Sequence, residues 1–246
     1  MSILSGVYGR AAQWRRAWYE RYPHRRARLD RPVISVGNLV VGGSGKTPTV
    51  AALARLLQQL GERPAILSRG YARSAPTDGV VVVSDGTRVL EPTARSGDEP
   101  QMLARSLDGV PVLVSRERFL GGRLAERRFD ATVHVLDDGF QHLRLMRDVD
   151  LVIVSRKDLD EEILPTGSLR EPVAAVRHAH AVLVPGSDED AAVVSEQLSR
   201  VVPQFFRIRT HYHALCPVHS GEARHADEGG RRVIAVAGIA RPDRMF

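Results

Sequence analysis

A short glycine-rich run holds the residue types that bind the phosphates of a nucleotide. The run Gly42-Gly43-Ser44-Gly45-Lys46-Thr47 follows the apolar segment Val33–Val36 and precedes a segment with helical periodicity. Glycines let successive backbone N–H groups turn toward one anion, and the helix adds the positive end of its dipole. The lysine would reach the β- and γ-phosphates, and the threonine hydroxyl would bind Mg²⁺. The sequence therefore predicts a phosphate-binding loop with these residues: Val40, Val41, Gly42, Gly43, Ser44, Gly45, Lys46 and Thr47.

Two features distinguish this loop. The strict phosphate-loop pattern has glycine at the position that Val40 occupies here. The chain also has only two lysines against 33 arginines, and one of the two is Lys46. Because arginine serves almost everywhere else, a compact ammonium is indicated at this position. The alternative, a glycine-rich turn with an incidental lysine, does not account for strand, loop and helix following in order.

Phosphoryl transfer also needs carboxylates that hold the metal and that orient or deprotonate the acceptor hydroxyl. Asp137 and Asp138 close the apolar segment Thr132–Leu136. The carboxyl ends of parallel strands form the ligand crevice of an α/β sheet, so either carboxylate could bind Mg²⁺ opposite Thr47. The alternative is helix capping at a strand-to-helix turn.

Weaker candidates lie elsewhere in the chain. Asp98 and Glu99 precede a predicted helix; Asp98 could be an N-cap or a catalytic base, and spacing does not separate these roles. Arg69 follows a predicted strand and could reach a phosphate or belong to a turn. His142 could be catalytic, although a lone histidine is more often structural. The histidines without metal-site spacing, which we expect in a solvated loop, are His211, His213, His219 and His225.

Alternating apolar strands and helices must position these residues. Helices are predicted over about Lys46–Leu60, Glu99–Leu107 and Arg116–Arg128. Strands are predicted at Val33–Val36, Pro64–Leu67, Val80–Val83, Pro111–Val114, Thr132–Leu136, Leu151–Val154, Ala181–Val184 and Val233–Val236. The alternation predicts an α/β fold, a P-loop NTPase-like, mostly parallel sheet with helices on both faces. We expect residues 210–230, rich in histidine, glycine and charge, to form a loop or hairpin.

An amphipathic helix is predicted before this fold, from about Ser2 to Tyr22. Its apolar stripe recurs at spacings of four and three and consists of Ile3, Val7, Ala11, Trp14, Trp18 and Tyr22. Arg10 and Arg21 border the stripe. Such a face suits the headgroup region of an anionic membrane. The alternative is a helix whose apolar face packs on the protein's own core.

The charge of the chain is concentrated at its beginning. Residues 1–31 hold eight arginines and two acidic residues, which accounts for the whole net charge of +6. The remaining residues hold 27 basic and 27 acidic side chains. Because nucleic-acid-binding modules spread positive charge over a folded face, this neutrality argues against one, and we expect no nucleic-acid partner.

Length and composition set further limits. The 246 residues, 43% of them hydrophobic, can bury the core of one large domain or two small ones. The single Cys216 excludes a disulfide framework and a cysteine-based metal site. No apolar run reaches the roughly 20 residues that span a bilayer. The N-terminus lacks the order of a secretory signal.

Six motifs in order resemble those of one family. They are Gly37-Asn38-Leu39-x-x-Gly42-Gly43-x-Gly45-Lys46-Thr47-Pro48, Ser68-Arg69-Gly70-Tyr71, Gly97-Asp98-Glu99-Pro100, Asp137-Asp138-Gly139-Phe140-Gln141-His142, Arg147-Asp148 and Leu164-Pro165-x-Gly167-x-Leu169-Arg170-Glu171-Pro172. Each motif alone is modest, but together they cover most of the chain and resemble the tetraacyldisaccharide 4'-kinases (lipid A 4'-kinases). The aromatic and arginine-rich N-terminal helix is similar to that family's membrane-associating segment.

The resemblance implies an activity and its participants. It implies transfer of the ATP γ-phosphate, with Mg²⁺, to the 4'-hydroxyl of a tetraacylated glucosamine disaccharide 1-phosphate in lipid A biosynthesis. The place implied is the cytoplasmic face of a bacterial inner membrane, with peripheral or monotopic attachment. Carried over by motif, Lys46 and Thr47 bind ATP and Mg²⁺, Asp98 is the base, and Asp137 and Asp138 are the metal and nucleotide carboxylates. Substrate contacts are implied for Arg69, Glu99, His142, Arg170 and Glu171, and Val40 matches the family's variant loop.

The resemblance also implies how the chain is divided. Residues 1–31 would be the membrane-associating helix and a basic linker, residues 32–230 the kinase domain, and residues 231–246 the start of a C-terminal part. Family members are expected to continue with an Asp-His-His motif. If the chain ending at Phe246 is the whole protein, weak activity or none is therefore expected. The segment Ser155–Glu162 departs from the Gly-Asn-containing stretch expected before Leu164.

One further function is the alternative to a lipid kinase. A P-loop regulatory NTPase would hydrolyse nucleotide to switch a protein partner. A GTPase of this type would have Asn-Lys-x-Asp after a late strand, whereas this chain has Ser155-Arg156-Lys157-Asp158. Guanine selection is therefore unsupported.

Overall fold

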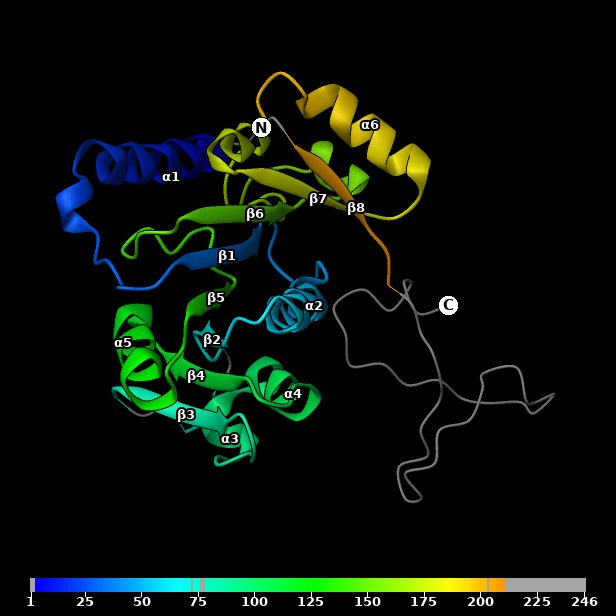
Figure 1. Ribbon diagram of the computed structural model, residues 1–246. Coiled ribbons are helices and arrows are strands. Elements are labelled where there is room, and N and C mark those ends of the chain that lie inside the picture. Colours follow the sequence, from blue (N-terminus) through cyan, green and yellow to red (C-terminus); the bar gives the residue numbers. More distant parts are fainter. Residues whose placement is uncertain (1–2, 72, 76–77, 203, 211–246) are drawn as a thin grey trace.

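The structure is a computed structural model that describes residues 3–71, 73–75, 78–202 and 204–210. Within these residues one eight-stranded sheet has the order β3-β4-β2-β5-β1-β6-β7-β8 (Figure 1). The strands are β1 (Val33–Asn38), β2 (Pro64–Ser68), β3 (Val80–Asp85), β4 (Pro111–Ser115), β5 (Val133–Asp137), β6 (Val149–Ile153), β7 (Ala181–Pro185) and β8 (Phe205–Ile208). Neighbouring strands are parallel except β3 and β4, which pair antiparallel, so the predicted mostly parallel sheet is confirmed.

Strand β1 lies near the middle of the sheet, between β5 and β6. Its register sets Val36 beside Asp137 of β5 and Asn38 beside Ile153 of β6. After β1 the chain crosses over β5 to reach β2, and it returns to the other side of β1 only with β6. The order of strands thus reverses at β1, and the ligand crevice of an open α/β sheet lies at such a point. The predicted phosphate loop follows β1 directly.

Helices cover both faces of the sheet. The α-helices are α1 (Ile3–Arg21), α2 (Lys46–Gln59), α3 (Thr93–Ser96), α4 (Asp98–Ser106), α5 (Arg118–Phe129) and α6 (Asp188–Leu198). The 3₁₀ helices are η1 (Pro23–Arg25), η2 (Arg156–Leu159) and η3 (Val173–His178). Buried side chains of α2 and α4 pack on one face, where Val36, Ile66 and Val114 point. Those of α5 and α6 pack on the opposite face.

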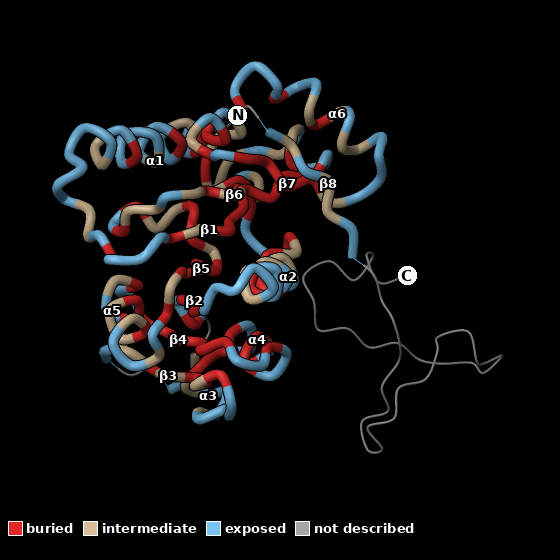
Figure 2. Tube along the Cα trace, in the orientation of Figure 1, coloured by how far each residue is buried: buried red, intermediate tan, exposed pale blue. Residues whose placement is uncertain are grey.

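Burial is concentrated in the central strands, while α1 is largely exposed (Figure 2). Every residue of β2, β4 and β5 is buried, which explains why these strands are continuous apolar runs in the sequence. Three buried residues of α1 face the protein: Ser5, Gly9 and Arg16. Among the described residues, no helix combines the length and the hydropathy needed to cross a membrane.

The expected strands and helices up to residue 184 are confirmed with small shifts of their ends. The short helix α3, the three 3₁₀ helices, β8 and α6 were not predicted. Strand β8 is half exposed at the sheet edge and therefore has no continuous apolar run. Helix α6 had a usable signal, since Ser187 and Asp190 form a capping box. The predicted strand Val233–Val236, the loop over residues 210–230 and the four histidines from His211 to His225 lie outside the described residues, apart from residue 210.

Candidate active site

The glycine loop lies between the end of β1 and the beginning of α2. Gly42 and Gly45 have φ values of 99° and 84°, in the left-handed region that side chains other than glycine rarely adopt. Gly45 is the N-cap of α2 and has no side chain to cap it. The first N–H groups of α2 thus remain directed at the crevice, where an anion can accept from them.

Lys46 lies inside this loop and is almost fully buried. Its Nζ donates to Asn38 Oδ1 at 3.2 Å and to the carbonyl oxygen of Gly42 at 3.4 Å. The same Nζ lies 3.7 Å from Asp138 Oδ1. Asn38 also donates from Nδ2 to Ser44 Oγ at 2.6 Å. Lys46 is thus held across the mouth of the loop by three oxygens.

The beginning of the loop is paired with a distant segment of the chain. Val40 forms an antiparallel bridge with Leu169, and the Val41 N–H donates to the Ser168 carbonyl oxygen at 2.8 Å. The Arg170 N–H donates to the Leu39 carbonyl oxygen at 2.7 Å. The Val40 side chain is fully buried in an apolar cluster. Valine at this position therefore has a packing role that glycine would not provide.

Asp138 is bound by Arg170 through both carboxylate oxygens. Arg170 Nη1 donates to Oδ2 and Nη2 to Oδ1, each at 2.8 Å, and Nη2 also donates to Asn38 Oδ1. Burial opposes ionisation of Asp138, but the Arg170 hydrogen bonds and the Lys46 charge prevail and lower its pKa. Asp138 has φ 54°, so the chain turns sharply after β5 and presents this side chain to the loop. Asp138 is therefore an ionised carboxylate already engaged by two cations.

Asp137 has a different environment. It is 1% exposed, and burial, followed by the charges of Glu99 and Asp138, raises its pKa to about 7. Ser68 Oγ donates to its Oδ2 at 3.4 Å, whereas Oδ1 is buried with no hydrogen-bond partner among the described residues. A buried, partnerless carboxylate oxygen beside a phosphate loop fits a divalent cation.

The described residues contain no group of three or more His, Cys, Asp or Glu side chains placed to hold a metal. Mg²⁺ usually takes one or two carboxylates and completes its shell with substrate phosphates and water. Asp137 and Thr47, each less than a tenth exposed, are the side chains that fit it.

Two glycines set the distance between β1 and the loop after β5. A Cβ on Gly37 would lie 2.5 Å from Phe140 Cβ, and one on Gly139 would lie 2.6 Å from Ser35 Oγ. Any other residue at either position would push the Asp137-Asp138 turn away from the phosphate loop. Glycine is thus required at both positions because the end of β1 and the loop after β5 lie too close together for a side chain.

Asp98 is the first residue of α4 and is exposed. Gly97, with φ 89°, is the N-cap, and no side chain caps the helix, so the structure does not support the N-cap role for Asp98. A Cβ on Gly97 would lie 2.8 Å from the Tyr71 carbonyl oxygen, which brings the Arg69-Gly70-Tyr71 turn against Asp98. Glu99 is exposed and close enough to Asp137 to raise its pKa.

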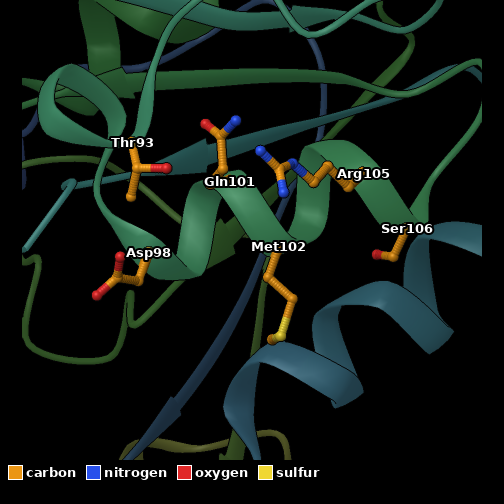
Figure 3. Close-up of a pocket in the computed structure, with 6 residues that line it drawn as sticks. All are labelled: Thr93, Asp98, Gln101, Met102, Arg105 and Ser106. Carbon is orange, nitrogen blue, oxygen red and sulfur yellow. The ribbon is translucent and has the colours of Figure 1, made fainter. Parts of the chain in front are cut away.

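A surface pocket of about 440 Å³ begins at Asp98 (Figure 3). It runs along α4, where Gln101 and Arg105 point to one side and Met102 points toward α2. The pocket is lined by Thr93, Asp98, Gln101, Met102, Arg105 and Ser106. Asp98 thus lies at one end of a surface pocket in which every lining residue except Met102 is polar or charged.

Arg118 and His142 lie together near the Asp137-Asp138 turn. Arg118 is 4% exposed, and its Nη1 lies 3.5 Å from His142 Nδ1. Burial and the nearby Arg69 charge lower the pKa of Arg118 to about 10. Burial and the Arg118 charge lower the pKa of His142 to about 3, so this imidazole is neutral at pH 7. A neutral histidine accepts or donates a hydrogen bond here but carries no charge.

Sequence reasoning assigned no role to Asn38 or Arg118. Asn38 is fully buried and joins Ser44, Lys46 and Arg170. Its position at the end of an apolar strand was the available signal, since a buried amide there needs partners. Arg118 gave no signal, because one arginine among 33 is not distinctive.

Glu171 lies on the far side of Arg170 from the phosphate loop. Its carboxylate accepts from Arg16 of α1, with Nε to Oε2 at 2.9 Å and Nη2 to Oε1 at 2.8 Å. Both side chains are buried. The structure therefore brings together Lys46, Thr47, Asp137, Asp138 and Arg170 and places Glu99 near Asp137. Arg69 and His142 lie near Arg118, Asp98 precedes Glu99 at the start of α4, and Glu171 is directed to α1.

Comparisons with known proteins agree with this arrangement. The family model described as tetraacyldisaccharide-1-P 4'-kinase matches residues 1–246. The tetraacyldisaccharide 4'-kinase of Geobacter metallireducens is 39% identical over 100% of this chain and 72% of its own length. That of Syntrophus aciditrophicus is 40% identical over 100% of this chain and 69% of its own length. A crystal structure of LpxK from Aquifex aeolicus, described as an apo form in complex with ATP, has a TM-score of 0.69 and 31% identity, covering 85% of this chain and 81% of its own.

Proposed function

Because the chain belongs to the tetraacyldisaccharide-1-P 4'-kinase family, we propose that its active site phosphorylates the 4'-hydroxyl of a tetraacylated glucosamine disaccharide 1-phosphate. The donor is the γ-phosphoryl group of ATP, and the enzyme is a phosphotransferase of lipid A biosynthesis. One observation carries the proposal. Lys46 of a phosphate loop lies 3.7 Å from Asp138, in a chain that matches the family model throughout.

The phosphates of ATP are held by the loop and its lysine. Backbone N–H groups from Gly42 to Thr47 and the N-terminus of α2 bind the phosphate oxygens. Lys46 would exchange its contacts with Asn38 and Gly42 for the β- and γ-phosphates. Asp138, fixed by Arg170, keeps the ammonium directed across the loop. These groups stabilise the charge on the transferring group.

Asp137 and Thr47 would hold Mg²⁺. The carboxylate oxygens of Asp138 already accept from Arg170, whereas Asp137 Oδ1 has no partner among the described residues. The pKa of Asp137, about 7 without a cation, fits a group that exchanges a proton for a metal. When bound, Mg²⁺ neutralises charge on the β- and γ-phosphates.

Asp98 is the general base. The 4'-oxygen of the sugar forms a bond to the γ-phosphorus while the bond to the β,γ-bridging oxygen breaks, the hydroxyl proton passes to Asp98, and ADP leaves. The exposed carboxylate at the edge of the crevice suits an acceptor that arrives from outside. Arg118 lies near Arg69 and near the Asp137 and Asp138 carboxylates, and the two positive charges favour the anionic transition state.

The lipid acceptor is met at a membrane surface, through α1. The exposed apolar side chains of this helix include Ile3, Leu4, Val7, Tyr8 and Trp14. Ile3 is 88% exposed and Trp14 is 70% exposed, so these side chains do not pack on the core formed by the described residues, which supports the membrane role. The buried side of the helix is formed by small residues and Arg16 instead. The apolar face with its flanking arginines supports peripheral attachment to an anionic bilayer, and we place the enzyme at the cytoplasmic face of the bacterial inner membrane.

The proposal is tested by following the γ-phosphate of labelled ATP into lipid. The wild-type chain is incubated with Mg²⁺, labelled ATP and the acylated disaccharide 1-phosphate, and lipid and phosphate products are separated by chromatography. We expect label in the lipid, with none after Lys46→Met. Lys157→Met is the matched control, because it removes the other lysine at an exposed position. The full-length relative from Geobacter metallireducens calibrates the assay.

The products distinguish the kinase from its alternative. Inorganic phosphate without labelled lipid, under conditions in which the relative labels the lipid, would contradict the kinase and favour the regulatory NTPase. Equal labelling by the wild type and by Lys46→Met would contradict the assignment of the site.

A further inference from the structure

We infer that Arg16, on the surface helix α1, is a positioning residue of the phosphoryl-transfer site. The inference rests on the proposed roles of Asp137, Asp138 and Arg170 and concerns how they are held. Arg16 is 4% exposed although α1 is otherwise largely exposed. Burying a guanidinium costs desolvation free energy unless its N–H groups are paired, so the partners of Arg16 must be well placed.

Arg16 contacts two segments of the active site at once. Its Nε and Nη2 donate to the two carboxylate oxygens of Glu171, and Nη2 also donates to the Phe140 carbonyl oxygen at 3.2 Å. Its guanidinium carbon lies 4.3 Å from the centroid of the Phe140 ring. Glu171 and Phe140 are themselves buried. One planar side chain therefore joins the turn after β5 to the segment before η3.

Each of these two segments carries one member of the Asp138–Arg170 pair. Phe140 is two residues after Asp138, and Glu171 directly follows Arg170. On one side of this backbone Arg16 binds Glu171, and on the other Arg170 binds Asp138. Moving either segment would separate the Asp138 and Arg170 side chains. Arg16 therefore acts through Phe140 and Glu171 and does not itself reach the substrate.

Other contacts of α1 fall on the same two segments. Ser5 Oγ lies 2.8 Å from Thr166 Oγ1, and a Cβ on Gly9 would lie 3.1 Å from Ile163 Cδ1. Arg15 donates to the Gln141 carbonyl oxygen at 3.2 Å. The helix thus lies on residues 163–172 with one side and presents Ile3, Val7 and Trp14 with the other. The helix proposed to meet the membrane therefore also packs against the turn that follows Asp138.

The test compares Arg16→Met, Arg16→Lys and a control, Arg200→Met, which makes the same change at an exposed position after α6. Two readouts need no lipid: amide hydrogen exchange over residues 138–142 and 168–171, and the Mg²⁺ concentration that half-saturates ATP binding. For Arg16→Met we expect faster exchange in both segments. We also expect the half-saturating Mg²⁺ concentration to rise about tenfold, as for partners that orient metal ligands. Arg16→Lys should restore part of both, because an ammonium keeps the charge but not the three contacts.

Kinetic and membrane readouts separate positioning from attachment. In the transfer assay Arg16→Met should lower kcat, while KM for the lipid and sedimentation with anionic phospholipid vesicles stay near the wild type. If Arg16→Met does not fold, Arg16→Lys decides, since it keeps the ion pair. The inference would be overturned if the Arg16 variant showed the same hydrogen exchange and the same Mg²⁺ dependence of ATP binding as Arg200→Met. An inactive wild-type chain would instead contradict the proposed function and leave these two lipid-free readouts in place.

Discussion

Arg170 binds both carboxylate oxygens of Asp138, with each N···O distance 2.8 Å, from a segment whose backbone is paired with the phosphate loop. The pair therefore fixes the loop after β5 relative to the loop after β1. Lys46 shares Asp138 with Arg170, at 3.7 Å. The position of the ammonium that meets the phosphates thus depends on a fork of two parallel hydrogen bonds.

Arg170→Met is expected to lower kcat by about 10- to 100-fold, because Asp138 loses its orienting partner. Arg170→Lys should recover little of this loss, since an ammonium cannot donate in the same fork geometry. The measurement is the rate of labelled lipid formation at saturating ATP. Full activity of Arg170→Lys would show that charge alone matters.

Asp137→Asn is expected to remove the main protein ligand of Mg²⁺. Metal stabilisation of phosphoryl transfer is worth several kcal/mol, so kcat should fall by about 10³-fold. Mg²⁺ titration of ATP binding should show weaker metal dependence. The Asp138→Asn variant, measured beside it, should keep more Mg²⁺ affinity than Asp137→Asn, and the reverse order would assign the metal to Asp138.

Asp98→Asn is expected to lower kcat by about 10²- to 10⁴-fold, the usual contribution of a general base. ATP affinity should change little, because Asp98 is exposed at the edge of the crevice and donates no ligand to the loop. Single-turnover rates and ATP binding would be measured on the same preparation. Wild-type turnover by Asp98→Asn would contradict the role of general base and would leave Asp98 a structural residue in the first turn of α4.

Membrane attachment is best tested by point substitution. Deleting residues 1–22 would remove Arg16 together with the apolar face, so it would mix two effects. Trp14→Ser removes an exposed apolar side chain, worth about 1.5–3 kcal/mol if it is buried in lipid, and vesicle binding should weaken roughly tenfold or more. Hydrogen exchange over residues 138–142 should be unchanged. Wild-type vesicle binding by Trp14→Ser would contradict attachment through this face.

The buried His142 predicts a pH dependence of stability. Its folded pKa, about 3, lies below its unfolded value, so only the unfolded state takes up a proton as the pH falls. Its contribution to stability is present above the unfolded pKa and is lost as the pH falls toward 3. Between pH 7.5 and 5.5 the loss is about 1 kcal/mol, or about 2–4 °C in Tm. His142→Asn should show a smaller Tm decrease over this range than the wild type. His24→Asn, which changes an exposed histidine, should show the same Tm decrease as the wild type.

Much of the architecture follows from local signals. The apolar runs of β1, β2, β4 and β5 are buried on both faces, which is why they were visible in the sequence. Glycines and acidic residues at the ends of β1 and β5 indicated the crevice. The positions of Lys46, Asp137 and Asp138 followed from these.

The remaining contacts depend on distant segments and had no local signal. The pairing of Glu171 with Arg16, 155 residues apart, could not be derived from spacing. The pKa is lowered for Asp138 and raised for Asp137 because Arg170 binds only one of these two adjacent carboxylates and the other is buried. The apolar stripe of α1 was visible, but its opposite side, which contacts the protein, carries small residues and one arginine. Such a face has no hydrophobic pattern to detect.

The bridge between Val40 and Leu169 has a consequence for how the site opens. Local unfolding proceeds in cooperative units, and two segments joined by backbone pairing belong to one unit. Loss of structure around residues 163–170 would therefore release the beginning of the phosphate loop, although no residue of the loop itself had changed. The conformation of the phosphate loop therefore depends on more than its own sequence. If residues 37–48 were grafted onto another sheet, they would lack the backbone pairing with residues 168–170 that holds them in this fold.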